Sequence, residues 1–331
     1  MLLSSSGPDT ATLGALKLLL QKVPGLNVVD GGGAIEPINS LDPPILRSAQ
    51  IVEGSSLRAA KVPNVSRQMT SGFGAFLDGA QRVQVIARQG GIPIVLGTIS
   101  AAVRVRVNRR LITWGHQPPR VERKLYLPFR YLPAMADLAS SSSRLGIVDT
   151  STVDSNGEYP SQHPTVLLER AVRSVDRQRD LLEDSLAEAW CARAEAPLFI
   201  DGGISRSKNV ASSSCAIGVV KSHRTLYVDG DSLAVVLGLA AGERSSVFRV
   251  SPRSRSGVLS WYLRLRNPDG HDAMWGLVRI EMSECDRPGE RADEISRWVM
   301  AETAPLALPD GRWDKMSYGV RDCEEFLRAI S

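Results

Sequence analysis

Cysteine is scarce in this chain of 331 residues, and no two of its cysteines are spaced as C-x-x-C. This argues against a disulfide framework and against a zinc site built on paired thiolates. No apolar run approaches the roughly 18 residues that a membrane-spanning helix requires. Residues 1–6 carry no basic side chain, unlike the start of a secretory leader. We therefore expect a cytoplasmic protein with reduced thiols and no membrane partner.

Several catalytic signatures are also missing. The chain contains no P-loop, no dinucleotide-binding glycine motif, no paired-histidine zinc protease motif and no nucleophile elbow. Its four histidines are scattered and show no metal-ligand spacing. Candidate chemistry must therefore be sought among the carboxylates.

Positive charge is modest in total but uneven along the chain. Forty Lys and Arg face 36 Asp and Glu, yet residues 104–130 hold eight basic residues against one acid, and residues 244–266 hold six Arg and no acid. Such stretches can neutralise phosphates, although charge alone fits a solvated strand face equally well. An aromatic side chain such as Tyr262 could also stack on the bases of an unwound strand. The candidate DNA-binding side chains are Arg104, Arg106, Arg264, Arg266, Tyr262 and His223.

The chain divides into an N-terminal part that is interrupted by glycine and proline and a longer part with regular secondary-structure patterns. Residues 1–70 are broken by glycine and proline, which indicates an N-terminal extension or accessory element. Residues 71–331 form the predicted main domain. Within it, residues 74–79 predict a strand that ends in a turn, and strands over 81–88 and 92–107 would continue an antiparallel meander.

A long helix is predicted over residues 164–193, where apolar residues recur at three- and four-residue steps after an initial proline. A short strand over 196–200 follows it. Further strands and closing helices over 290–303 and 322–330 complete the pattern. The order predicts an α/β fold, with one mixed sheet flanked by helices.

Two predicted strands end in the same way, as Leu77-Asp78-Gly79 and Ile200-Asp201-Gly202. A carboxylate at a strand end is exposed at the sheet edge, and the glycine lets the chain turn and another group approach. Two such aspartates on neighbouring strands can share a hard cation such as Mn²⁺ or Mg²⁺. Asp-Gly is also the commonest turn dipeptide, so each motif alone is weak evidence.

Further candidates lie near these motifs in the sequence. Glu183 sits at the edge of the predicted helix's apolar stripe, with Glu188 as its competitor, and an exposed helix carboxylate is the alternative for both. Lys221 follows a predicted strand and could hold a phosphate, or simply be a surface lysine. Asp314 could be a metal ligand or a helix cap. If the carboxylates converge, two metal ions would support phosphodiester hydrolysis.

In their order and spacing, these features resemble the NurA family of nucleases. The similarity rests on the two Asp-Gly motifs, on Glu183, and on residues 218–221, 260–266, 275–281 and 312–327, and it covers residues 71–330. It implies an RNase H-like core and Mn²⁺-dependent DNA cleavage of the 5′–3′ exonuclease and single-strand endonuclease type. It also implies a homodimer that works with a HerA-like hexameric ATPase, in DNA-end resection or anti-phage defence.

Carried onto this sequence, the resemblance makes Asp78, Glu183 and Asp201 the catalytic metal ligands, with Lys221 as the basic residue beside them. Many relatives have a histidine ligand near the C-terminus, and here none occurs after His271. Asp314 is the expected replacement. That departure supports an alternative, a catalytically degenerate RNase H-like module that binds DNA or regulates the ATPase. An RNase H-like enzyme acting on RNA is a third possibility.

Overall fold

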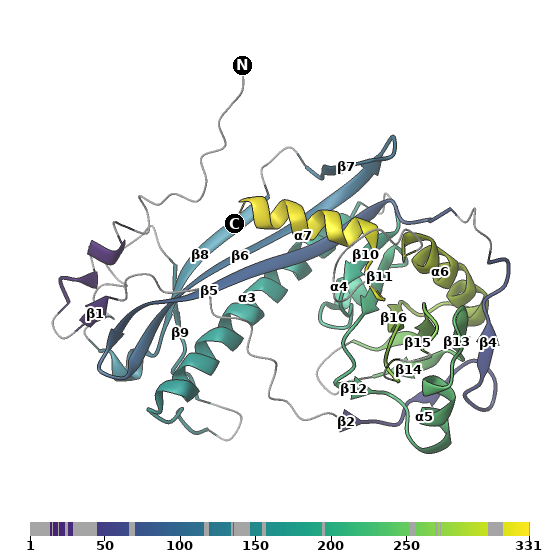
Figure 1. Ribbon diagram of the computed structural model, residues 1–331, viewed down its shortest axis with the longest axis horizontal. Helices are drawn as coiled ribbons and strands as arrows, with labels where there is room; N and C mark the ends of the chain where they lie inside the picture. Colours follow the sequence, from purple (N-terminus) through teal and green to yellow (C-terminus); the bar gives the residue numbers. More distant parts are fainter. Residues whose placement is uncertain are drawn as a thin grey trace.

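A long mixed sheet runs through the computed structural model, and helices cover both of its faces (Figure 1). The structure describes residues 45–65, 70–115, 119–133, 146–153, 157–193, 196–251, 256–268, 273–303 and 314–330, with short pieces between 14 and 28 and the single residues 135 and 271. In spatial order, the main path of the sheet is β3 (Gln50–Ile51), β14 (Phe248–Val250), β15 (Val258–Arg264), β16 (Leu277–Met282), β11 (Ala216–Val220), β10 (Leu198–Asp201), β5 (Ala75–Gln89), β6 (Ile92–Val107), β8 (Arg120–Leu127) and β9 (Gly146–Asp149).

The long strands β5 and β6 form an antiparallel hairpin, and β8 extends it. The strand predicted over 92–107 is confirmed. The turn predicted at Asp78-Gly79 is wrong, because β5 continues through both residues and stays paired with β6. The only interruption of this ladder is a register shift between Val85 and Ala87. Local turn propensity is overridden here by continuous pairing with a neighbouring strand.

A second hairpin, between β6 and β7 (Arg110–Thr113), projects beyond the rest of the sheet (Figure 1). Its two-residue loop is Asn108-Arg109, and both residues have positive φ, 49° and 65°. That geometry is the type I′ turn that matches the twist of paired strands. Asparagine tolerates it well, whereas arginine is strained there.

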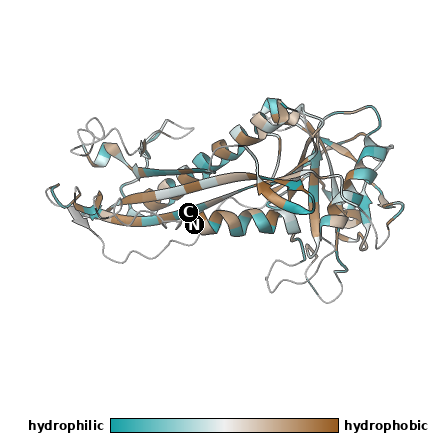
Figure 2. Ribbon diagram, turned by 90° about the horizontal axis from the view of Figure 1, so that it is seen from above, coloured by the Kyte–Doolittle hydropathy of each residue, from teal (hydrophilic) through white to brown (hydrophobic). Residues whose placement is uncertain are grey.

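The long helix α3 (Pro164–Cys191) covers one face of β5, β6 and β8. Proline occupies its first turn, and the ring of His163 accepts the backbone N–H of Thr165. Apolar residues on one side, such as Val175 and Leu182, join a core cluster with β5, β6 and β8. Figure 2 shows the apolar banding of these strands and the mixed faces of the helices.

β10 lies between β5 and β11, and it is parallel to both of these neighbours. Beyond them, β16, β15 and β14 are antiparallel. Helices α6 (Pro288–Thr303) and α7 (Tyr318–Ile330) contribute to a core cluster that includes Phe76 and Phe199. Leu77 and Ile200 belong to the cluster of α3 instead. Because neighbouring residues of a strand face opposite ways, α3 and α7 cover opposite faces.

The remaining described elements are short. They are β1 (Leu26–Val28), β2 (Ile45–Leu46), β4 (Ala59–Lys61), the 3-10 helix η1 (Phe129–Tyr131), α4 (Lys208–Ala211), β12 (Thr225–Leu226), α5 (Gly230–Leu237) and β13 (Glu243–Ser245).

Strands from residues 1–70 are built into the sheet rather than set apart from it. β3 pairs with β14, β4 pairs with β13, and β1 pairs with β5. The stretch predicted as an extension thus supplies edge pairing to strands far along the chain. No helix among the described residues combines the length and the apolar character needed to cross a bilayer.

Candidate metal centre

Asp78 and Asp201 lie side by side on neighbouring strands. β5 and β10 are parallel, and Leu77 pairs with Ile200, so the two aspartates occupy the next position of each strand. Both side chains leave the sheet on the α7 face, two residues after Phe76 and Phe199. The sequence prediction that these two carboxylates meet is therefore confirmed.

The third carboxylate of this group comes from α7. One oxygen each of Asp78, Asp201 and Glu324 lies within 4.8 Å of the others. Three oxygen donors at this spacing suit a hard divalent cation. We name Asp78, Asp201 and Glu324 the acidic cluster.

Glu324 was not among the residues predicted from sequence. A usable indication was present, because α7 is amphipathic and Glu324 lies four residues after Val320 and next to Cys323, both buried. An acid at the border of an apolar stripe points toward the sheet. Its side chain is only 13% exposed, whereas Glu325 beside it is 58% exposed.

Basic side chains compensate only part of the negative charge in the acidic cluster. Burial and then the nearby charge of Asp201 raise the pKa of Asp78 well above its usual value, while Lys221 opposes the shift. The Lys221 Nζ lies 2.8 Å from Asp201 Oδ2. The backbone N–H of Gly79 donates to Asp78 Oδ1 at 2.8 Å. Arg321 and Arg328 lie 3.9 Å and 3.7 Å from Glu324 Oε2. A cation would relieve the repulsion that remains between Asp78 and Asp201. The predicted position of Lys221 beside the carboxylates is confirmed.

Glu183 approaches the acidic cluster from the opposite face of the sheet. It projects from α3 over Gly79, and its charge raises the pKa of Asp78. Its Oε1 lies 3.2 Å from Arg179 Nε, and its Oε2 lies 3.4 Å from an Arg206 amino group. Burial nevertheless raises the pKa of Glu183 to about 7. Glu183 is therefore beside the predicted centre but bound to two arginines.

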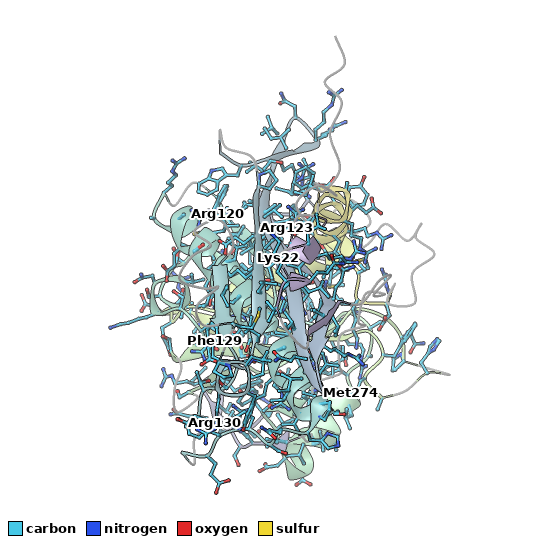
Figure 3. All side chains as sticks on the ribbon, turned by 90° about the vertical axis from the view of Figure 1, so that its left-hand side faces the viewer. Lys22, Arg120, Arg123, Phe129, Arg130 and Met274 are labelled. Carbon is cyan, nitrogen blue, oxygen red and sulfur yellow. The ribbon has the colours of Figure 1, made fainter. Side chains whose placement is uncertain are left out.

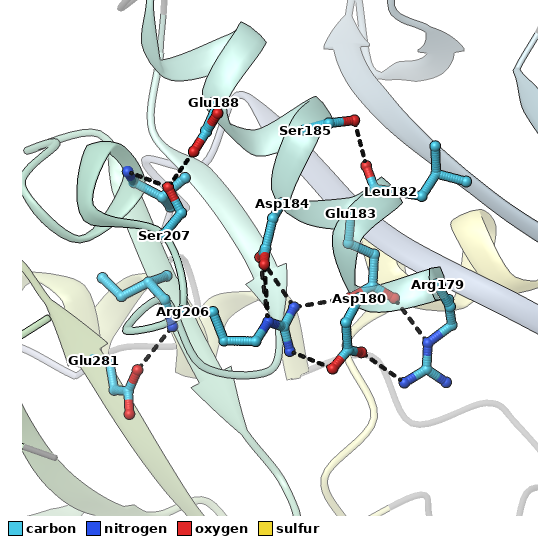
Figure 4. Close-up of polar contacts among 12 residues, drawn as sticks. Arg179, Asp180, Leu182, Glu183, Asp184, Ser185, Glu188, Arg206, Ser207 and Glu281 are labelled. Atoms are coloured by element: carbon cyan, nitrogen blue, oxygen red, sulfur yellow. Dashed lines mark hydrogen bonds and ion pairs between the residues drawn. The ribbon is translucent and has the colours of Figure 1, made fainter. Parts of the chain in front are cut away.

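Arg206 links this carboxylate to the rest of α3 (Figure 4). Its guanidinium also contacts Asp184 at 3.1 Å and Asp180 at 3.3 Å. Glu188, the competing candidate, instead accepts a hydrogen bond from Ser207, the N-cap residue of α4. The two glutamates thus have different surroundings, and only Glu183 adjoins the acidic cluster.

The turn after Asp201 is held by a buried carboxylate on β16. Gly202 has φ of 129°, which favours glycine, and the Ile204 N–H donates to Glu281 Oε2 at 2.8 Å. The other oxygen of Glu281 lies 2.5 Å from Arg279. This pair fixes the chain where it leaves β10 and so positions Asp201.

The prediction that Asp314 is a metal ligand requires correction. Asp314 is buried, and its Oδ2 accepts the backbone N–H of Gly276 at 2.8 Å. Gly276 has φ of 62° at the β15–β16 connection, so the carboxylate stabilises a turn. Within the described residues, the group of possible metal ligands does not include Asp314.

The prediction that Tyr262 and Arg264 bind DNA is wrong, because both side chains are fully buried. The Tyr262 hydroxyl accepts the backbone N–H of Tyr227 at 2.9 Å, and its ring packs against Phe248. Arg264 donates to the carbonyls that end α5 and precede β16, those of Leu237, Leu239, Ala273 and Trp275. Neither side chain is available to a polyanion.

The other predicted DNA contacts also have partners in the protein. Arg104 pairs with Asp322 at 2.7 Å, Arg106 pairs with Glu302 at 2.8 Å, and Arg266 donates to the Thr303 carbonyl. His223 Nε2 contacts the Leu277 carbonyl at 2.7 Å, and burial lowers the pKa of its ring to about 4. These residues connect helices and strands and do not form an open basic surface.

Exposed basic residues do occur elsewhere on the same strands. Arg109 and Arg110 are exposed at the β6–β7 hairpin, and Arg120 is exposed at the start of β8. Figure 3 labels Arg120 and Arg123 in the view along the strands. Such side chains offer charge to a phosphate backbone without being held by the core.

A scan of the chain against protein-family models and a search of curated proteins found no match. The residues of the site must therefore carry any functional conclusion.

Proposed function

We propose that this protein is a metal-dependent nuclease that hydrolyses phosphodiester bonds in DNA. The observation that carries the proposal is the acidic cluster, in which three carboxylate oxygens from β5, β10 and α7 lie within 4.8 Å of one another. The donor set fits Mn²⁺ or Mg²⁺, which favour oxygen ligands. Three elements that are far apart in the sequence each contribute one carboxylate to this point, as is typical of a metal-binding site.

In the proposed reaction, Asp78, Asp201 and Glu324 hold the cation. A bound divalent cation would activate water and polarise the phosphate. Lys221, 2.8 Å from Asp201, pairs with that carboxylate and would carry positive charge toward a phosphate oxygen. Glu183, whose pKa is raised to about 7, is suited to accept or donate a proton near neutral pH.

We further propose that the core is RNase H-like. The topology supports this assignment, since three antiparallel strands (β5, β6 and β8) are followed by a long helix, and then by β10 and β11 in parallel beside β5. The partners proposed with it, a second copy of the chain and a HerA-like hexameric ATPase, rest on the sequence resemblance to NurA nucleases. So does a role in DNA-end resection or anti-phage defence.

The proposal is tested by cleavage of single-stranded and open-ended duplex DNA with Mn²⁺. Asp78→Asn and Asp201→Asn should lose cleavage, while Asp286→Asn, at an exposed position, should retain it. Equal cleavage by all four proteins would reject the site. RNA and an RNA–DNA hybrid in parallel reactions would reveal a different substrate class.

A second candidate is the non-catalytic module, and the ion pairs of Glu183 favour it. Two arginines already compensate this carboxylate, so fewer ligands are free for a cation. Calorimetric titration with Mn²⁺ separates the candidates, because a degenerate site would show no binding.

A further inference from the structure

Two cysteines meet near the N-terminal ends of β10 and β11, at the opposite end of these strands from the acidic cluster. Cys191 is the last residue of α3, and Cys215 immediately precedes β11. Their Sγ atoms lie 3.7 Å apart, and both residues are partly exposed. The acidic cluster lies instead where β10 ends.

The surroundings of the two sulfurs differ in a way that suits thiol chemistry. Contact with Cys191, together with Ser213 Oγ at 3.1 Å, lowers the pKa of Cys215 to about 6. The contact with Cys215, and then burial, raise the pKa of Cys191. Cys215 is thus the more readily ionised sulfur of the pair, and Cys191 is the less readily ionised one.

The other two cysteines lack this arrangement. Cys285 is an exposed residue, although partial burial of its thiol raises its pKa. Cys323 lies on the buried face of α7, and burial raises its pKa too. Among the described residues, neither thiol has a second cysteine sulfur beside it, and the Cys323 thiol instead donates to the Phe76 carbonyl. Cys285 and Cys323 therefore serve as internal controls for the reactivity of the Cys191–Cys215 pair.

We propose that Cys191 and Cys215 form an oxidation site, which hydrogen peroxide converts into an intramolecular disulfide. The Cys215 thiolate attacks the peroxide O–O bond, forming a sulfenic acid and releasing hydroxide. The Cys191 sulfur then attacks that sulfenic sulfur and loses its proton, and the S–OH oxygen leaves as water. The two sulfurs are oxidised by two electrons in total, and the peroxide is reduced to two waters after hydroxide takes up a proton.

The required movement is small. A disulfide S–S bond is about 2.05 Å long, so the sulfurs must approach by roughly 1.7 Å. The Cys215 carbonyl accepts the Leu198 N–H at 2.8 Å and stays in the sheet, so rotation of the two side chains must supply most of the closure. The bond would join the end of the helix that carries Glu183 to the strand that leads to Lys221. Its formation does not depend on the proposed nuclease activity.

The test is oxidation of the whole chain with a small molar excess of hydrogen peroxide, followed by thiol counting and non-reducing peptide mapping. Wild type should lose two of its four thiols and yield one peptide linked through Cys191 and Cys215, with the chain remaining a single covalent molecule. The Cys285→Ser variant should give the same linked peptide. Cys191→Ser should stop at a Cys215 sulfenic acid that dimedone labels.

Two results would overturn the proposal. One is preferential oxidation of Cys285 with both thiols of the pair intact. The other is equal dimedone labelling of Cys215 in wild type and Cys191→Ser, because a resolving thiol should suppress the label in wild type. Mapping of wild type alone decides the first point, even if a serine variant folds poorly.

Discussion

Glu183 reaches the acidic cluster only because residue 79 has no side chain. A Cβ placed on Gly79 would lie 2.2 Å from Glu183 Oε1, far inside contact distance. Gly79 continues β5 with ordinary strand pairing to β6, so its role is close approach and not a turn. The glycine after Asp78 thus lets a helix on one face of the sheet place an acid beside carboxylates on the other.

Gly79→Ala should therefore displace Glu183 from the acidic cluster. We expect a loss of about 1–3 kcal/mol in the free energy of unfolding, because extra volume is forced into a packed site. Urea denaturation measures it. Gly257→Ala is the matched control, since the nearest atom to its added Cβ would be 3.4 Å away. The double change Gly79→Ala/Glu183→Ala should regain part of the loss, and an unchanged loss would contradict the steric explanation.

Stability of the metal-free protein should fall as pH rises from about 4.5 to 7. The folded form keeps the Glu183 proton up to about pH 7, whereas the unfolded chain releases it near 4.5. More protons are then bound in the folded state, so the free energy of unfolding decreases with pH in this window, by up to about 1.4 kcal/mol per unit. The raised pKa of Asp78 acts in the same direction.

Glu183→Gln should flatten this slope, as measured by urea unfolding at a series of pH values in a chelator. The exposed Glu284→Gln change should leave the slope as in wild type. A slope that is equally steep in Glu183→Gln would assign the pH dependence to other groups.

Glu324→Gln should weaken Mn²⁺ binding by at least about tenfold, since even altering a partner of a metal ligand typically costs about 10- to 100-fold. Glu290→Gln on α6 provides the control, because that residue is exposed and pairs with Arg287 on the helix surface. Isothermal titration with Mn²⁺ is the measurement. Equal affinities in the two variants would remove α7 from the site.

Arg264→Met should destabilise the fold rather than alter DNA binding. The guanidinium is fully buried and donates to four backbone carbonyls, which the methionine would leave without this donor. We expect a loss of about 3 kcal/mol or more in the free energy of unfolding. Arg249→Met, which removes a surface pair with Glu284, should change stability little. Weaker DNA binding with wild-type stability would reverse this assignment.

Element prediction succeeded where the sequence pattern was long or sharply bounded. The strand over residues 92–107 matches the observed one, and α3 ends within two residues of the predicted position. The prediction of a turn at Asp78-Gly79 failed, because the propensity of a dipeptide carries no information on the fourteen residues of β5 that pair with β6. The N-terminal strands were missed because they are two or three residues long and become ordered by pairing with β13 and β14.

The sequence by itself determined that two aspartates follow short apolar runs, and that a long amphipathic helix separates them. Periodicity and composition are local properties, so they can be recognised from the sequence alone. Only the tertiary structure decided that Glu324 joins these aspartates, while Asp314 caps a turn and Arg264 is buried. Which face a strand residue occupies depends on register, and register is fixed by packing between segments distant in the chain.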